Sequence, residues 1–420
     1  MLSLCISAVS SNQGKTILTS ALLHHFRDSV RPFKAGPDFI DPQFHARVCG
    51  TPSINLDGFM TNREQLEWLY RHYSDRKVSI IEGVMGFYDG MDRESSAYDI
   101  AKALNVPTLL LLDGSGSYIT LSAVLKGLKT YREDNTIRGV VLNKISSQGH
   151  YALIRDRIEA DFDDVAVAGW IPADLDALRD THLGLDLEDL GKMETIAREV
   201  LEHIDLETLR RIGKCEAKAP EGYPFDPLPR IPRTIAVVHD EHFSFLYEDN
   251  LAVLREVFAE CRIIRPSDNE PIPPGCDAVY LCGGYVETER AYASLCRADK
   301  FKASLIEHAK TKKVYAECAG LLYLGQSVDD KAMSGILPVS FTLQKRFERL
   351  GYYVNEEGVR GHAFHYTKPL DDTQGFDILS KSPGGSGKPG SWQNREGNVF
   401  GTYLHTMFRP NIGWLAKRLM

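Results

Sequence analysis

Short apolar runs that alternate with amphipathic stretches constrain the fold of this chain more than any other feature. The runs lie at residues 2–8, 106–112, 137–144 and 165–172, and an amphipathic stretch at residues 151–160 separates the last two. Continuous apolar runs are typical of strands that are buried on both faces of a parallel sheet, and the amphipathic stretches predict the helices that cover it. The first half of the chain therefore predicts a doubly wound α/β domain.

A proline-rich stretch divides the chain. Residues 214–233 contain five prolines, a composition typical of a semi-rigid linker. Another apolar run begins at Thr234, and a helical pattern follows near Phe245 to Glu260. Because 420 residues exceed one ordinary core, we expect a first α/β domain at 1–213, a linker at 214–233 and a second α/β domain at 234–420. A Gly/Pro/Ser-rich segment at 382–391 predicts a surface loop.

The first apolar run leads into a loop that contains Gly14, Lys15 and Thr16, and a helical pattern begins at Ile17. A loop between a strand and a helix is the setting of a phosphate-binding loop, in which backbone amides and the helix N-terminus receive phosphate oxygens. Lys15 would neutralise phosphate charge, and the Thr16 hydroxyl would join the Mg²⁺ shell. Val9 occupies the place of the first glycine of the strict G-x-x-x-x-G-K-[ST] pattern, so the tripeptide alone is a weak signal.

Ionisable residues follow two further predicted strands. Lys34, Asp38 and Asp41 lie in a loop rich in proline, glycine and aspartate, where a solvated turn is the alternative. The apolar run at 78–81 ends at Glu82 and a glycine-rich turn, and an acid at this place beside a phosphate loop commonly holds nucleotide-bound Mg²⁺. Asn143 ends another strand, where it either reads an adenine edge or caps a turn.

The stretch from Val314 to Leu324 reads as a strand, a sharp turn at Cys318 and a helix. This arrangement is a nucleophile elbow, and the helix N-terminus favours thiolate over thiol. A small buried core cysteine is the alternative. The paired glycines Gly283 and Gly284 offer amides for an oxyanion, and His405 ends a late apolar run. Together these features predict acyl transfer at a carbonyl, with His405 as general base to Cys318.

Cysteine spacing and charge exclude several classes of protein. The eight cysteines form no C-x-x-C pair, which argues against zinc sites and a disulfide framework, and we expect a reducing cytoplasm. His362 and His365 have no third ligand in sequence reach, so we expect structural roles for them. The net charge of −8 argues against nucleic acid, and no apolar run approaches a membrane span. We therefore expect no nucleic-acid or membrane partner.

Ordered motifs extend through both predicted domains. They lie at residues 14–16, 33–42, 55–58, 81–89, 142–144, 282–285, 315–324, 361–366 and 403–405. With these motifs essentially the whole chain resembles the cobyrinate a,c-diamide synthases, which are glutamine-dependent amidoligases of cobalamin biosynthesis. The first domain resembles dethiobiotin synthetase, whose phosphate loop has a longer spacing, and the second resembles the class I glutamine amidotransferases.

The resemblance implies amidation of the a and c carboxylates of a corrin macrocycle through an acyl phosphate, with ATP, Mg²⁺ and glutamine as partners. In the first domain it implies ATP contacts at Gln13, Gly14, Lys15, Thr16 and Asn143, a metal at Thr16 and Glu82, and substrate carboxylate contacts at Lys34, Asp38, Asp41 and Asp89. In the second domain it implies a nucleophile at Cys318, a base at His405 and an oxyanion hole at Gly283, Gly284 and Ala319. Among assemblies, a homodimer is the one that we consider for this chain.

The chain departs from the pattern of the family at four places. Asn12 stands where a loop glycine is common, and a Cβ atom narrows the backbone conformations open to that residue. Ala319 and Ala363 replace residues that are commonly Gly and Glu. Thr406 and Met407 follow His405, so the acid of the H-x-E motif of many amidotransferases is absent. The motifs leave open what orients His405.

Four other readings are considered. The ligase that diamidates nickel-sirohydrochlorin shares these motifs, and the sequence does not reveal which macrocycle and metal are used. Cobyric acid synthase is a less favoured alternative because it resembles a longer chain. A partitioning-type regulatory ATPase with an inactive glutaminase-like domain is an alternative of another class. Such ATPases carry an additional lysine early in the loop, where this chain has Ser10. A scaffold with a dead glutaminase is disfavoured because Cys318 and His405 are both present.

Overall fold

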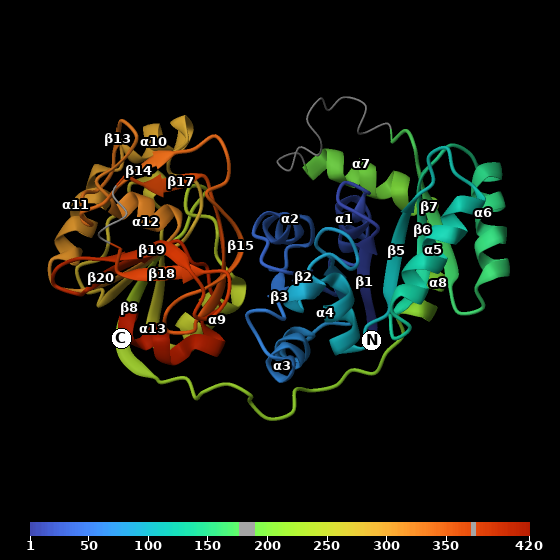
Figure 1. Ribbon diagram of the computed structural model, residues 1–420, viewed down its shortest axis with the longest axis horizontal. Helices are drawn as coiled ribbons and strands as arrows, with labels where there is room; N and C mark the ends of the chain where they lie inside the picture. The colour runs from blue at the N-terminus through green and yellow to red at the C-terminus, as the bar shows by residue number, and fades with distance from the viewer. Residues whose placement is uncertain (176–189, 371–374) are drawn as a thin grey trace. The chain divides into compact units, whose positions relative to one another are not determined.

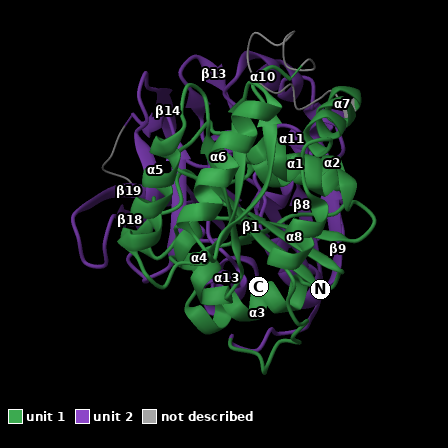
Figure 2. Cartoon of the chain, turned by 90° about the vertical axis from the view of Figure 1, so that its right-hand side faces the viewer, with its two compact units in different colours: residues 1–224 green, residues 225–420 purple. Residues whose placement is uncertain are grey.

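The computed structural model describes residues 1–175, 190–370 and 375–420, which divide into two compact units, Met1–Pro224 and Phe225–Met420 (Figure 2). The division falls within the predicted linker, although β8 already begins at Ile231. Among the described residues, no helix is long and apolar enough to cross a membrane.

Unit 1 alternates strands and helices, as the apolar runs predict (Figure 1). Its elements are β1 (Leu2–Ala8), α1 (Lys15–His25), β2 (Val30–Ala35), α2 (Ile40–Cys49), β3 (Ile54–Leu56), α3 (Arg63–Tyr73), β4 (Val78–Glu82), α4 (Ala97–Leu104), β5 (Thr108–Asp113), α5 (Ile119–Tyr131), β6 (Ile137–Ile145), α6 (Gln148–Asp161), β7 (Ala166–Pro172), α7 (Leu190–Leu201) and α8 (Leu206–Ile212). The described strands form one parallel sheet in the order β3-β2-β4-β1-β5-β6-β7.

Strand β1 shows why this sheet is covered on both faces. Its even-numbered residues, such as Leu4 and Ile6, join a buried cluster with Leu18 of α1 and Val200 of α7. Ser3 points to the opposite face, where its hydroxyl bonds Tyr70 of α3. From β1 the chain runs toward β2 and β3, at one edge of the sheet. From β4, which lies next to β1 on that same side, it crosses to β5 on the other side of β1, so the direction of winding reverses at β1. Ligands of open α/β sheets bind beyond the carboxyl ends of the strands at such a point.

Unit 2 contains a mixed sheet and a small second sheet. Its elements are β8 (Ile231–Val238), α9 (Glu248–Val257), β9 (Phe258–Ile264), β10 (Ala278–Leu281), α10 (Glu289–Leu295), α11 (Asp299–Ala309), β11 (Lys313–Glu317), α12 (Ala319–Leu324), β12 (Ser327–Val328), β13 (Lys331–Ala332), β14 (Ser340–Leu343), β15 (Arg349–Val354), β16 (Arg360–His365), β17 (Thr367–Pro369), β18 (Asp377–Ser380), β19 (Gly387–Gln393), β20 (Val399–Thr402) and α13 (Ile412–Leu419). The larger sheet has the order β16-β15-β18-β19-β20-β11-β10-β8-β9, of which β20 to β9 are parallel.

Three local predictions for unit 2 are wrong in part. The segment predicted as a surface loop at 382–391 contains the start of β19, which pairs with both β18 and β20. A register shift between Asp377 and Ile378 lies opposite this stretch, and such an irregularity lets a strand accommodate Pro389. The helix expected to reach Glu260 ends at Val257 because the chain enters β9. The strand expected to end at His405 stops at Thr402.

Candidate active sites

The phosphate-loop candidate lies where β1 passes into α1, at the reversal point of the sheet. Gly14 precedes α1 with a φ of 88°, and a Cβ atom there would lie 2.5 Å from Nδ2 of Asn143. The backbone at this turn therefore requires glycine. Asn12 also has a positive φ, 61°, so the replacement of a loop glycine keeps a left-handed conformation that asparagine tolerates better than most residues.

Lys15 is folded back over this loop. Its Nζ donates to the carbonyl oxygen of Ser10 at 3.0 Å and to that of Met85 at 2.6 Å. Burial, together with the nearby Lys34 cation, lowers the pKa of Lys15. Carbonyl oxygens are weak substitutes for phosphate oxygens, so this ammonium group is held at the loop where an anion would stabilise it.

Glu82, at the end of β4, is the hub of a buried network. Its Oε1 accepts from the Thr16 hydroxyl at 2.8 Å and from Lys34 Nζ at 3.4 Å, and its Oε2 lies 2.6 Å from Nε2 of His45. Burial alone would raise the pKa of Glu82, but Lys34 and His45 hold it well below its usual range. Glu82 is therefore an anion in the neutral pH range.

Lys34 brings the acids of its loop to the same place. Its Nζ donates to Oδ2 of Asp41 at 2.5 Å, and Oδ2 of Asp38 lies 3.7 Å away. Although burial opposes it, the charges of Glu82 and Asp41 raise the pKa of Lys34 above its ordinary value. Burial and the Glu82 carboxylate raise the pKa of Asp41 to about 6. The structure thus brings Lys34, Asp38, Asp41 and Glu82 together, but the prediction of one loop is wrong for Lys34, which lies in β2, and for Asp41, which lies in the first turn of α2.

His45 belongs to this network, and sequence reasoning missed it. It lies on α2, is fully buried and has its Nδ1 3.1 Å from the Ser53 hydroxyl. The available signal was its spacing: Asp41 and His45 are four residues apart and therefore share one face of α2. That pattern is common on helices, so it singles out no residue by itself.

Asp89 and Asn143 support the loops around the network. Oδ2 of Asp89 accepts from the amide of Gly86 at 2.8 Å, in the turn that follows β4. Nδ2 of Asn143 donates to the carbonyl oxygen of Gln13 at 2.8 Å, and its Oδ1 accepts from the amide of Lys144. Gln13 itself accepts from the amide of Val9 through Oε1. Of the two predicted roles of Asn143, these bonds correspond to the structural one.

Cys318 in unit 2 forms the predicted elbow. It stands between β11 and α12 with φ 44° and ψ −103°, a conformation that costs energy for any residue with a Cβ atom. Its amide donates to the carbonyl oxygen of Thr402 on β20 at 2.8 Å, which fixes the turn to the sheet. The thiol lies at the N-terminus of α12, whose first amides have no partner within the helix.

His405 lies against this elbow. Its backbone exchanges two hydrogen bonds of 2.8 Å with His362 on β16, and its ring interacts with the Cys318 side chain, which helps to raise the pKa of His405. Its Nδ1 lies 3.2 Å from Oε2 of Glu317, and both side chains are about 1% exposed. The predicted nucleophile and base therefore meet, and Glu317 joins them without having been predicted.

The glycine pair after β10 packs on this site. A Cβ atom at Gly283 would lie 2.3 Å from Cε1 of His405, and one at Gly284, whose φ is 149°, would lie 2.1 Å from the carbonyl oxygen of His242. Gly283 is thus required for the His405 ring to take its place. The oxyanion role of Gly283, Gly284 and Ala319 stays a prediction.

Comparison with known proteins identifies the family of this chain. A family model described as a CobB/CobQ-like glutamine amidotransferase domain matches residues 234–412, and one described as an AAA domain matches residues 3–179. A protein of Listeria monocytogenes named cobyrinate a,c-diamide synthase is 32% identical over 98% of this chain and 97% of its own length. A protein of the same name from Saccharolobus solfataricus is 35% identical over 87% of this chain and 88% of its own length. The chain belongs to the cobyrinate a,c-diamide synthase family.

This membership confirms the family that the sequence motifs predict, together with the α/β fold class of both units. Two departures from the motifs of the synthases are accommodated in the core. Ala319, the first residue of α12, and Ala363, on β16, are both fully buried in the cluster that packs unit 2. Both positions therefore hold a small apolar side chain in the packed interior.

The two histidines of the 361–366 motif of the synthases have packing contacts. His365 donates from Nδ1 to the carbonyl oxygen of Thr367 at 2.8 Å, and its ring stacks on Tyr403 with centroids 3.6 Å apart. His362 forms the backbone bridge to His405. These contacts give both residues a structural role near the elbow.

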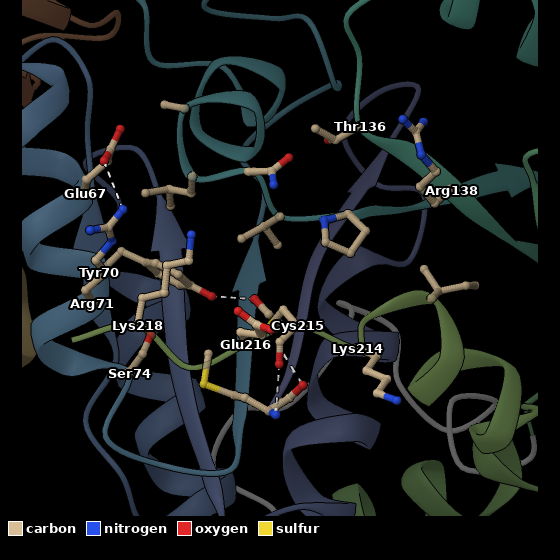
Figure 3. A pocket seen from close by; sticks show the side chains of 18 of the residues that line it. Glu67, Tyr70, Arg71, Ser74, Thr136, Arg138, Lys214, Cys215, Glu216 and Lys218 are labelled. Carbon is tan, nitrogen blue, oxygen red and sulfur yellow. Dashed lines mark hydrogen bonds and ion pairs between the residues drawn. The ribbon is translucent and has the colours of Figure 1, made fainter. Parts of the chain in front are cut away.

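A pocket of about 620 Å³ in unit 1 lies away from the phosphate loop of the same unit (Figure 3). It is lined by Ser3 at the start of β1, Pro107 before β5 and Thr136 before β6, which places it at the amino ends of the strands. In this pocket Arg71 pairs with Glu67 at 3.3 Å (Figure 3). Ligands of parallel sheets bind at the opposite edge, so this pocket is not the nucleotide site of the synthases.

Proposed function

We propose that this protein amidates the a and c carboxylates of cobyrinate, using ATP for activation and the amide of glutamine as the source of ammonia. The observation that carries the proposal is the presence, on one chain of this family, of a phosphate loop with a charged network and a Cys–His elbow. An amide can form from a carboxylate only after one carboxylate oxygen becomes a leaving group, and this requirement explains why two sites are needed.

The residues of unit 1 suit the activation step. A substrate carboxylate oxygen attacks the γ-phosphorus of ATP, the bond to ADP breaks, and an acyl phosphate results. Lys15 and the amides of the phosphate loop bind phosphate oxygens, and Lys34 lies 2.5 Å from Asp41 at the place where the substrate carboxylate would enter. Ammonia then attacks the acyl carbon and phosphate leaves, so each amide consumes one ATP and one glutamine.

Thr16 and Glu82 fit Mg²⁺. Thr16 Oγ1 and Glu82 Oε1 are oxygen ligands 2.8 Å apart, close to the roughly 3 Å that separates neighbouring ligands around an octahedral ion with bonds of about 2.1 Å. Bound there, the ion would neutralise phosphate charge and orient ATP for attack. Protein sites for nucleotide-bound Mg²⁺ commonly contribute only one or two such ligands. A metal at Thr16 and Glu82 is therefore part of the proposal.

His45 should tune this site through Glu82. Replacement of His45 by Ala removes the partner that lies 2.6 Å from Glu82 Oε2, and loss of a residue that orients a metal ligand costs about 10- to 100-fold in metal affinity. We expect half-saturating Mg²⁺ in the amidation assay, and the Kd of MgATP by calorimetry, to rise by about 10-fold or more. His45→Gln retains an N–H donor, so its half-saturating Mg²⁺ concentration and its Kd of MgATP should lie between those of the unaltered protein and those of His45→Ala.

His150→Ala is the matched control for this prediction, because His150 lies on α6 and bonds the carbonyl oxygen of Ser117 instead. This variant should keep the Mg²⁺ dependence of the unaltered protein. An unchanged Mg²⁺ dependence in folded His45→Ala would show that Glu82 needs no support from His45.

The residues of unit 2 suit ammonia release. His405 takes the proton of the Cys318 thiol, and the thiolate attacks the carboxamide carbon of glutamine, whose oxygen gains a negative charge that amides near Gly284 and Ala319 receive. The C–N bond then breaks as His405 gives the proton to the departing ammonia, which leaves a thioester on Cys318. Water then hydrolyses the thioester and releases glutamate. His405 is placed for both proton transfers because it contacts the thiol and is held by Glu317.

The function is tested by incubating the purified protein with ATP, Mg²⁺, glutamine and cobyrinate, and in parallel with nickel-sirohydrochlorin. We expect the cobyrinate reaction to release glutamate and yield the diamide by mass spectrometry. Diamidation of nickel-sirohydrochlorin alone would assign the protein to the related ligase. ATP hydrolysis with no amide formed from either macrocycle would favour a regulatory ATPase.

A further inference from the structure

We infer that Glu317 is the positioning residue of the glutaminase site, in place of the acid that the H-x-E motif supplies elsewhere. This inference rests on the proposed role of Cys318 as the glutaminase nucleophile. Glu317 ends β11 and directly precedes Cys318, and its Oε2 lies 3.2 Å from Nδ1 of His405. Cysteine, histidine and acid thus form one chain of contacts in which the nucleophile and the acid are sequence neighbours.

The sheet explains how the carboxylate is held. Side chains two residues apart on a strand share a face, so Tyr315 and Glu317 point the same way from β11. Tyr280 on β10 pairs in register with Tyr315 and therefore lies beside it. The Tyr280 hydroxyl donates to Oε2 of Glu317 at 3.0 Å, and the Tyr315 hydroxyl donates to Oε1 at 2.7 Å. Both carboxylate oxygens are thus fixed by buried donors.

The position that the acid of the H-x-E motif would occupy holds a methionine in this chain. Two residues after His405 stands Met407, which is 3% exposed and has no group that can accept a proton. Thr406, between them, donates from its hydroxyl to the carbonyl oxygen of Arg360 at 2.7 Å. The segment after His405 therefore serves packing, while the acid approaches the same ring from the neighbouring strand.

The contact with Glu317 favours the tautomer of His405 that can exchange a proton with Cys318. A carboxylate accepts, so Nδ1 carries the proton and Nε2 is left for the thiol. Burial alone would lower the pKa of His405, but its hydrogen bonds with Cys318 and Glu317 raise that pKa to about 9. The imidazolium that protonates the departing ammonia is therefore stabilised at neutral pH.

Other titratable groups face this chain of contacts from each element packed against it. They are Tyr280 and Cys282 at β10, Tyr315 and Cys318 at β11, and His365 on β16. Burial together with the Glu317 charge raises the pKa of Tyr280, Cys282 and Tyr315 well above their ordinary values, and burial lowers the pKa of His365. Tyr280, Cys282, Tyr315 and His365 therefore stay neutral at neutral pH, and the charges that His405 responds to are those of Glu317 and Cys318.

Glu317→Gln in the full chain tests the inference. We expect glutaminase kcat to fall about 100-fold or more. The loss of the Glu317 charge lowers the pKa of His405, so the alkaline limb of the glutaminase pH profile should move to lower pH by about 1 unit. Alkylation of Cys318 by iodoacetamide should require higher pH, because the imidazolium no longer stabilises the thiolate. Amidation with ammonia should be unchanged.

Two further variants separate positioning from packing. Glu317→Asp retains the charge and should restore part of kcat and the position of the alkaline limb. Tyr280→Phe removes a donor to Glu317 and leaves the carboxylate, so it should not move the alkaline limb to lower pH. If Glu317→Gln fails to fold, Glu317→Asp decides instead: folded protein should have a lower glutaminase kcat than the unaltered protein, because the shorter side chain holds His405 less closely, and an unchanged kcat would contradict the inference.

A purely structural role predicts a lower yield of folded protein with the pH profile of the unaltered enzyme, and that result would overturn the inference. Alkylation and glutamate release need no macrocycle. They therefore report on Glu317 even if cobyrinate is not the substrate, and a failure of the proposed function is visible separately as a lack of amide product.

Discussion

Cys318→Ala is expected to abolish glutamine-dependent amidation and to leave ammonia-dependent amidation at the level of the unaltered protein. The thiol is the group that attacks glutamine, and no other nucleophile stands on the elbow with φ 44° between β11 and α12. Loss of a nucleophile that acts with its base costs about 1,000-fold or more in kcat. The measurement is amide formation by mass spectrometry with glutamine or ammonium chloride as donor.

Cys276→Ala is the matched control for this variant. Cys276 is also buried in unit 2 but lies before β10, at the amino ends of the strands and away from His405. It should retain both activities. If Cys318→Ala kept glutamine-dependent amidation, the nucleophile would lie elsewhere, and if it lost the ammonia reaction as well, Cys318 would matter to folding or to activation.

Lys15→Ala should have the complementary effect: it should abolish amidation with either donor and leave hydrolysis of glutamine in unit 2 measurable. Nζ of Lys15 is held over the phosphate loop by the carbonyl oxygens of Ser10 and Met85, at 3.0 and 2.6 Å, and is the cation placed to receive phosphate charge. Removal of one such group from a transition state costs about 100- to 1,000-fold. ADP release and amide formation are measured together.

Lys126→Ala is the control, because Lys126 is exposed on α5 and far along the chain from the loop. It should behave as the unaltered protein. Retention of ATP-dependent amidation in Lys15→Ala would mean that the loop does not bind the phosphates. The pair of results for Cys318→Ala and Lys15→Ala would separate ammonia supply from carboxylate activation.

Residues marked by local pattern could be predicted from the sequence. Gly14, Lys15 and Thr16 lie where β1 leads into the start of α1, and Cys318 lies at a strand–turn–helix junction, so the surrounding residues reveal each of them. Glu82 was predictable because it ends an apolar run, and parallel strands bring their carboxyl ends to one edge. The same rule places Lys34, near the end of β2, beside Glu82, whereas Asp41 reaches the network from α2, in a stretch that the sequence predicts as a loop.

Residues whose role depends on pairing between distant segments could not be predicted. Glu317 is the last residue of a strand, and only the approach of His405, 88 residues later, turns it into a positioning acid. His45 is an ordinary helix residue until Glu82 lies beside it. Pro389 suggests a loop, and β19 forms because its neighbours β18 and β20 accommodate an irregular register. Tertiary contacts decide all three.

The central claim is that one chain moves nitrogen from the amide of glutamine to a carboxylate that ATP has activated. Incubation with glutamine labelled with ¹⁵N at its amide, ATP, Mg²⁺ and cobyrinate tests it most directly, with the product analysed by mass spectrometry. The account predicts a diamide that carries two labelled nitrogens, with one ADP and one glutamate released for each amide. Release of glutamate and ADP with no label in the macrocycle would contradict it.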